Sequence, residues 1–169
     1  MEIPVINIRK RKILEEELLA DYESGPLWVV DNDAKRGREL NFKIYDDLAG
    51  QYEIYLDGEF RHKDDISDGI TMGASNVTIS EQIEDEAIRE LLSITESMIL
   101  YYRGDDHKIE IFRDEGGLYV YSDSTIPEGM KQVFTRKISC DNCILLIDIG
   151  EYNGRRDKET DLLPQKNTG

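Results

Sequence analysis

The chain has 169 residues, enough for one domain of ordinary size with a single hydrophobic core. Its formal net charge of -15 repels phosphate backbones and anionic lipids, so we expect no general binding to nucleic acid or membrane. No apolar run reaches the roughly 20 residues of a transmembrane helix, and the start MEIPVINIRKRK lacks the order of a signal peptide, which predicts a cytoplasmic location.

Short apolar runs alternate with helical patterns along the chain. Apolar runs of strand length lie at 3–8, 27–30, 52–56, 76–80, 108–112, 118–122 and 143–149. Helical patterns lie at 12–22, 40–50, 64–73, 84–102 and 127–137. Apolar strands without strict alternation are typical of sheets covered on both faces, and intervening helices imply a parallel sheet. The sequence therefore predicts an α/β fold with about six main strands, without separating an open sheet from a barrel.

The two cysteines, Cys140 and Cys143, lie together in SCDNC. A structural zinc site usually takes four Cys or His ligands, and only His62 and His107 remain to complete one. A redox CxxC normally precedes a helix, whereas this one precedes the apolar run CILLIDI. The pattern favours two free thiols at the start of a strand over a zinc or redox site, and we expect neither metal nor cofactor.

Four segments occur in an order that resembles a known family: IPVINI (3–8), VVDNDAKRGRELN (29–41), LDGEFRHKDDISDGITMGASNVTIS (56–80) and LLIDIGEYNG (145–154). Together they resemble the HisA/HisF family of histidine-biosynthesis isomerases and cyclases, especially its divergent archaeal HisA/HisF-like branch. The resemblance spans most of the chain. It implies a TIM barrel, (β/α)8, with its site at the carboxyl ends of the strands.

The resemblance also implies that the catalytic pair of this family is lost. Family enzymes use an aspartate after the first strand and another after the fifth as acid and base. Asn7 stands at the first position, and aligning GGLY with the family's turn after strand five puts Phe112 at the second. An amide cannot act as a general acid or base near neutral pH. Asp114 could be a displaced carboxylate, and Asp148 matches an aspartate in the family's last motif.

Phosphate binding is a further property that the resemblance implies. The family's phosphate turn after strand three reads LDGEFR here, which keeps Gly58 and Arg61 but adds two acids. Ser80 stands where the family has a second phosphate turn. These three residues are the candidates for binding a phosphorylated small molecule. The basic run 9–12 would lie on the same face, either attracting an anionic ligand or forming a solvated loop.

Asp31 and Asp33 directly follow the apolar run 27–30 and would share one side of a strand. Such a pair could hold Mg²⁺ with a phosphate, but the partner motifs of phosphatases and toprim modules do not follow in order. In the family alignment the pair shapes the mouth of the barrel. The remaining alternative, slightly favoured, is two solvated acids at a strand exit.

The resemblance predicts an incomplete, C-terminally truncated TIM barrel over residues 1–163 and a polar tail at 164–169. CILLIDI would be its sixth strand, so that the seventh and eighth have no counterpart. Because unpaired edge strands expose backbone groups, we expect a homodimer or a partner chain to cover them, with a repacked open sheet as the alternative.

Two functions fit these expectations. The first is a barrel protein without the isomerase acid and base that binds a phosphorylated small molecule or serves as an assembly partner. The second is an active sugar-phosphate isomerase or lyase with relocated carboxylates. Its candidate catalytic residues are Asp31, Asp33, Asp114 and Asp148.

Overall fold

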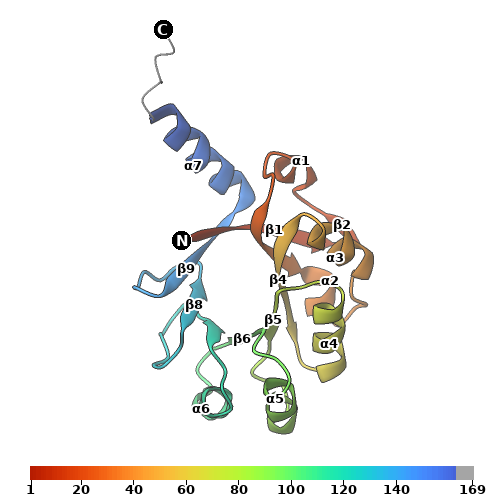
Figure 1. The fold of residues 1–169 in the computed structure, drawn as a ribbon, viewed down its shortest axis with the longest axis vertical. Helices are drawn as coiled ribbons and strands as arrows, with labels where there is room; N and C mark the ends of the chain where they lie inside the picture. Colours follow the sequence, from red (N-terminus) through yellow and green to blue (C-terminus); the bar gives the residue numbers. More distant parts are fainter. Residues whose placement is uncertain (163–169) are drawn as a thin grey trace.

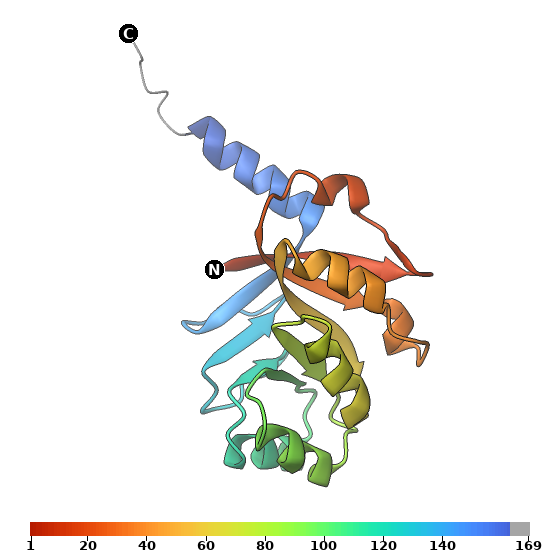
Figure 2. The same cartoon turned by 45° about the vertical axis from the view of Figure 1, so that its right-hand side comes forward.

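Eight parallel strands form a closed barrel in the computed structural model (Figures 1 and 2). The structure describes residues 1–162, with side chains over 1–158, so the tail predicted at 164–169 lies outside the described residues. The barrel strands are β1 (Glu2–Arg9), β3 (Gly25–Asp31), β4 (Tyr52–Phe60), β5 (Asn76–Ile79), β6 (Met98–Tyr101), β7 (Tyr119–Tyr121), β8 (Gln132–Thr135) and β9 (Cys143–Asp148). The short β2 (Lys12–Ile13) pairs antiparallel with β1.

Helices cover part of the outside of this barrel. They are α1 (Glu16–Leu19), α2 (Asn32–Lys35), α3 (Phe42–Ala49), α4 (Lys63–Thr71), α5 (Asp85–Leu92), α6 (Asp106–Asp114) and α7 (Ile149–Leu162). The connections from β7 to β8 and from β8 to β9 contain no helix. Both views show α7 extending away from the barrel (Figures 1 and 2).

Pairing between the first and last strands closes the sheet. β1 pairs in parallel with β3 on one side and with β9 on the other, in the register Ile3 to Leu146. The predicted α/β barrel fold is confirmed, but the prediction of an incomplete barrel with about six strands is wrong in its strand number. CILLIDI provides the eighth barrel strand rather than the sixth. The closed barrel leaves no open edge for a partner chain to cover. The expected homodimer or partner chain remains a prediction, but unpaired edge strands no longer support it.

Three segments explain the difference in strand number. β6 lies inside the helical pattern predicted for 84–102, and β8 lies inside the one predicted for 127–137. Residues 108–112, predicted as a strand, belong to α6, where Asp105 caps the helix by accepting a hydrogen bond from the Lys108 N–H at 3.0 Å. Ile109 and Phe112 then share one helical face toward the core. Strands of four residues gain their stability from neighbours in the sheet, so local periodicity identifies them poorly.

Large rings fill the inside of the barrel. Trp28 and Tyr55 each pack against Phe134, with ring centroids 5.3 and 5.4 Å apart, and Tyr101 stacks on Tyr121 at 4.3 Å. Aliphatic side chains from β1, β6 and β9 complete this cluster. A second cluster lies between the outer face of the strands and the helices. A few bulky rings thus fill a barrel whose chain is much shorter than the about 250 residues that are typical.

Replacing Phe134 tests how much stability this aromatic packing provides. Its side chain is 1 % exposed, so we expect Phe134→Ala to lower the free energy of unfolding by about 3–5 kcal/mol through lost burial and a residual cavity. Ile94→Ala is the control, because Ile94 is 82 % exposed, and should change stability by less than about 0.5 kcal/mol. Urea unfolding measures both values. Similar effects of the two substitutions would contradict the role given to the rings.

Candidate functional site

A cavity of about 520 Å³ opens at the carboxyl ends of the barrel strands. Barrels of this kind place their binding and catalytic residues at this end. Residues near the carboxyl ends of β1, β3, β4, β6 and β7 and in the segments after β3, β6, β7 and β8 line the cavity: Asn7, Val30, Lys35, Asp57, Glu59, Tyr101, Tyr102, Arg103, Tyr121, Asp123, Ser124, Arg136 and Lys137. We call it the mouth cavity, and it is the candidate functional site.

Asp57 provides a buried carboxylate among these lining residues. It is 1 % exposed, because alternation along β4 turns it to the inside of the barrel with Tyr55. Its Oδ2 accepts hydrogen bonds from Tyr101 Oη at 2.7 Å and Trp28 Nε1 at 3.0 Å. Its Oδ1 accepts from Thr78 Oγ1 at 3.0 Å and lies 3.2 Å from the Lys35 ammonium. The carboxylate is therefore fully partnered, as a buried charge must be.

Glu59, two residues after Asp57 in β4, forms ion pairs with two cations. Arg103 binds its carboxylate with both terminal nitrogens, at 2.5 and 2.7 Å, and Lys35 Nζ lies 3.3 Å from it. Burial raises the pKa of Glu59, but the bonds from Arg103 and the charge of Lys35 outweigh it and hold the pKa below its ordinary value. Burial and the nearby Asp57 raise the pKa of Tyr101 far above its ordinary value. Near neutral pH, Glu59 therefore stays ionised and Tyr101 stays neutral.

A second set of polar residues forms the rim near β7 and β8. Asp123 accepts hydrogen bonds from Tyr121 Oη at 2.5 Å and from the Arg136 N–H at 2.8 Å. The Arg136 guanidinium lies 3.1 Å from Asp148, an exposed carboxylate that ends β9. Lys137 is exposed and makes no ion pair with any residue in the described range. Lys137 is thus the cation of this site most open to a ligand, whereas Arg136 is held by Asp148.

The mouth cavity is more basic than the rest of the protein. Its lining holds four cationic side chains (Lys35, Arg103, Arg136, Lys137) and three carboxylates (Asp57, Glu59, Asp123), whereas the whole chain carries -15. With Asp148, which pairs with Arg136 from outside the lining, the charges of the mouth are nearly balanced, so an anion meets far less repulsion there than elsewhere on the chain. Most of the surrounding surface would repel it.

A second cavity of about 440 Å³ brings together the three residues predicted to bind phosphate. Gly58, Arg61 and Ser80 all line it. Lys35 and Glu59 line both this second cavity and the mouth cavity. Gly58 is required by packing, because a Cβ atom there would lie 2.4 Å from the Phe60 ring.

Asp31 and Asp33 are buried and lie outside both cavities, so the favoured prediction of two solvated acids is wrong. Alternation along β3 points Asp31 outward, where it caps α2 by accepting from the N–H groups of Asp33 and Ala34, each at 3.0 Å. It also accepts hydrogen bonds from Asn41 and Tyr45. Asp31 thus fixes the chain after β3 from the outer side of the barrel.

Asp33 holds the turn between β1 and β2. Its carboxylate accepts from the N–H groups of Lys10 and Arg11, both at 2.9 Å. These two residues have φ angles of 51° and 61°, which cost side chains other than glycine about 1–2 kcal/mol each. Hydrogen bonds to a charged group contribute about 1.5–3 kcal/mol each, so the Asp33 carboxylate is sufficient to offset that strain.

The positions assigned by the resemblance lie at different places in the barrel. Asn7 does line the mouth cavity, with its side-chain Nδ2 donating to Glu15 at 2.8 Å. Phe112 is buried in α6 and does not follow the fifth barrel strand. That strand is β6, which ends in Tyr101. Asp114 ends α6, the helix that leads to the amino end of β7, so it lies at the opposite end of the barrel.

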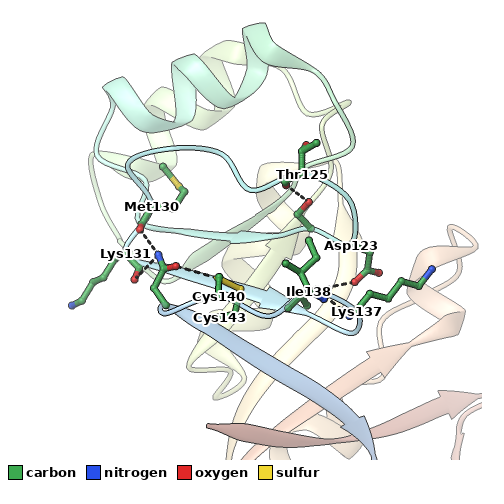
Figure 3. The surroundings of a disulfide bond; sticks show 11 residues. Asp123, Thr125, Met130, Lys131, Lys137, Ile138, Cys140 and Cys143 are labelled. Carbon is green, nitrogen blue, oxygen red and sulfur yellow. Dashed lines mark hydrogen bonds between the residues drawn. A yellow bond between two sulfur atoms is a disulfide. The ribbon is translucent and has the colours of Figure 1, made fainter.

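Cys140 and Cys143 form a disulfide, as Figure 3 shows, so the prediction of two free thiols is wrong. Cys143 does begin a strand, β9. Between them, Asn142 donates from its side chain to the Met130 carbonyl at 2.9 Å. The disulfide lies near the amino end of β9, away from the mouth. It closes a ring of four residues, for which loop entropy gives only about 2 kcal/mol of stabilisation.

The main residues of the site that the sequence did not identify are Asp57, Tyr101, Arg103 and Arg136. Asp57 and Glu59 were noticed only as acids that weaken a phosphate turn. Tyr101 ends β6, and Arg103 and Arg136 follow β6 and β8, the two strands that periodicity missed. The usable signal was strand alternation in YEIYLDGEF, which places Asp57 on the same side as Tyr55.

Comparison with models of known protein families finds no match to this sequence, and comparison with curated proteins finds no significant match. None of the helices within residues 1–162 has the length and apolar character needed to cross a bilayer. Over the same residues, no group of three His, Cys, Asp or Glu side chains converges as a metal site would require. The candidate site therefore rests on its own geometry.

Asp33→Asn tests the role of Asp33 at the turn. The N–H groups of Arg11 and Lys10 and the amide of Asn41 hold the pKa of Asp33 below its ordinary value, against the effect of burial. Its stabilising contribution is therefore complete above about pH 4 and is lost as the pH falls through the lowered pKa. We expect the variant to be less stable by about 1–3 kcal/mol at pH 7 and closer to the unaltered protein in acid.

Urea unfolding between pH 7 and pH 2 measures this difference. Asp114→Asn is the control, because Asp114 is exposed and makes no ion pair among the described residues. It should shift stability by less than about 0.5 kcal/mol. A constant difference between Asp33→Asn and the unaltered protein at every pH would contradict the role given to this carboxylate.

Proposed function

We propose that this protein binds a small phosphorylated compound at the mouth of its barrel. The supporting observation is that four cationic side chains gather with three carboxylates in the lining of the mouth cavity, within a chain of net charge -15. A volume of about 520 Å³ suits a ligand of metabolite size. Arg136 and Lys137 present cations at the rim. The sequence resemblance to the HisA/HisF family, whose enzymes act on phosphorylated sugars, supports the same ligand class and remains part of the proposal.

The two cavities suggest how such a compound would lie. The second cavity gathers Gly58, Arg61 and Ser80, so we assign the phosphate group to it. Lys35 and Glu59 line both cavities, so we assign the rest of the compound to the mouth cavity. A ligand that spans both cavities would bind more tightly than a phosphate ion alone, because it would contact both sets of lining residues.

An isomerase or lyase is the second candidate function, and the Asp57, Tyr101 and Lys35 cluster is the observation in its favour. A carboxylate, a phenol and an ammonium group meet there within 3.3 Å of one another. General acid–base catalysis works best with a pKa near the working pH. The pKa of Tyr101 is raised and that of Glu59 is lowered, so both groups are shifted away from neutrality. We therefore favour a binding protein over an enzyme.

The cytoplasmic location expected from the sequence stays a prediction. Disulfides are rare in reducing compartments, and the pair formed by Cys140 and Cys143 argues for a more oxidising one. Counting free thiols in protein taken directly from cells distinguishes these two environments. Two free thiols would support the cytoplasm.

Thermal unfolding with ribose 5-phosphate tests the proposed function. A ligand that binds only the folded chain stabilises it by about 2.7 kcal/mol at 100 times its dissociation constant, so the melting temperature should rise. Unphosphorylated ribose should produce a much smaller rise. Arg61→Ala removes a charged hydrogen bond and should weaken binding by about tenfold or more.

Arg113→Ala is the matched control, because Arg113 is exposed in the last turn of α6, away from both cavities. It should bind ribose 5-phosphate as the unaltered protein does. The absence of any rise in melting temperature with this and other phosphorylated sugars would contradict the proposed ligand class. An equal loss of binding in Arg61→Ala and Arg113→Ala would contradict the assigned phosphate position.

A further inference from the structure

Two basic segments that are distant in the sequence form one surface on this acidic protein. They are RKRK at positions 9–12 and KRGR at positions 35–38, which we call the basic rim. These eight positions hold seven of the chain's 21 Lys and Arg residues and no Asp or Glu. Asp33 joins the two segments. Its carboxylate accepts hydrogen bonds from the N–H groups of Lys10 and Arg11, and its carbonyl accepts from those of Arg36 and Arg38.

Most cations of the basic rim are free to meet a partner. Arg9, Lys10, Lys12, Arg36 and Arg38 are exposed, and their side chains form no ion pair with any described residue. Only Arg11, paired with Glu39 at 3.0 Å, and Lys35, in the mouth, are engaged.

Lys10 and Arg11 are unfavourable residues for the backbone conformation of the turn that they form. A two-residue turn with both φ angles positive is the type that Asn-Gly forms without strain. Lys10 and Arg11 occupy it instead, and the buried Asp33 is needed to hold them. The sequence thus keeps two cations at the tip where an uncharged pair would fold more readily.

The shape of the basic rim favours a macromolecular partner. The tip of the hairpin formed by β1 and β2 projects beyond the barrel (Figure 2). Positions 9–12 line neither cavity of the candidate site, whereas Lys35, Arg36 and Gly37 line the second cavity. Small molecules bind in concave sites, which this tip does not offer. Two large apolar side chains adjoin the rim in the chain: Leu14, which is 59 % exposed, and Phe42, which is 39 % exposed.

The charge of the whole chain decides between classes of partner. Nucleic acid and anionic membranes extend over the acidic remainder of the surface and would be repelled there. A second copy of the chain would carry the same net charge of -15. A short, extended acidic segment can lie on the rim alone. We propose that the basic rim is a docking surface for an acidic segment of another protein.

Fluorescence anisotropy with a labelled octaglutamate peptide tests this surface in the full-length chain. The peptide should bind at low salt and weaken at about 0.15 M salt, where the screening length falls to about 8 Å. Lys10→Asn combined with Arg11→Gly installs the unstrained turn, so this variant should remain folded and lose octaglutamate binding by about tenfold. Lys131→Asn combined with Arg113→Gln removes two exposed cations at the other end of the barrel and should bind normally.

Several outcomes would overturn the proposal. One is that octaglutamate binds no more tightly than neutral octaglutamine. Another is that the two double variants lose octaglutamate affinity equally. Tighter binding of a single-stranded oligothymidylate would assign the rim to nucleic acid, and tighter binding of inorganic triphosphate would assign it to a small anion. Because neither double variant touches Arg61, failure of this test leaves the ribose 5-phosphate result unaffected.

Discussion

The pairing of β1 with β9 is the constraint on which the rest of this structure depends. It joins the two ends of a sheet whose strands β5 to β8 have only three or four residues each. A closed sheet has no free backbone edge, so the fold is complete without a second chain. Closure also brings the carboxyl ends of all eight strands into one ring. The mouth cavity exists because residues from six of those strand ends meet there.

Strand alternation within this ring decides which acidic residues reach the mouth. Asp31 ends β3 on the outward face, and with Asp33 it organises the loops around the barrel. Asp57 in β4 faces inward and is held by Trp28 and Tyr101. Both buried carboxylates are matched by hydrogen-bond donors. The visible DxD motif is therefore structural, and the less conspicuous Asp57 belongs to the site.

The sequence was sufficient for the fold class but not for the number of strands. Long apolar runs such as IPVINI and CILLIDI identify strands by themselves. MILY and QVFT do not, because their conformation depends on neighbouring strands and on the rings packed inside the barrel. The site was incompletely predicted for the same reason. Gly58, Arg61 and Ser80 do converge on one cavity, whereas the residues after β6 and β8 could not be placed before those strands were known.

We propose that the charges at the mouth of the barrel receive a phosphorylated ligand. Amide chemical shifts followed during titration with ribose 5-phosphate test it most directly. We expect changes at Glu59 near the end of β4, at Arg103 and Lys137 after β6 and β8, and at Arg61 and Ser80. The residues around the disulfide, at the other end of the barrel, should not change. Changes confined to that end, or none at all at saturating ligand, would contradict the account.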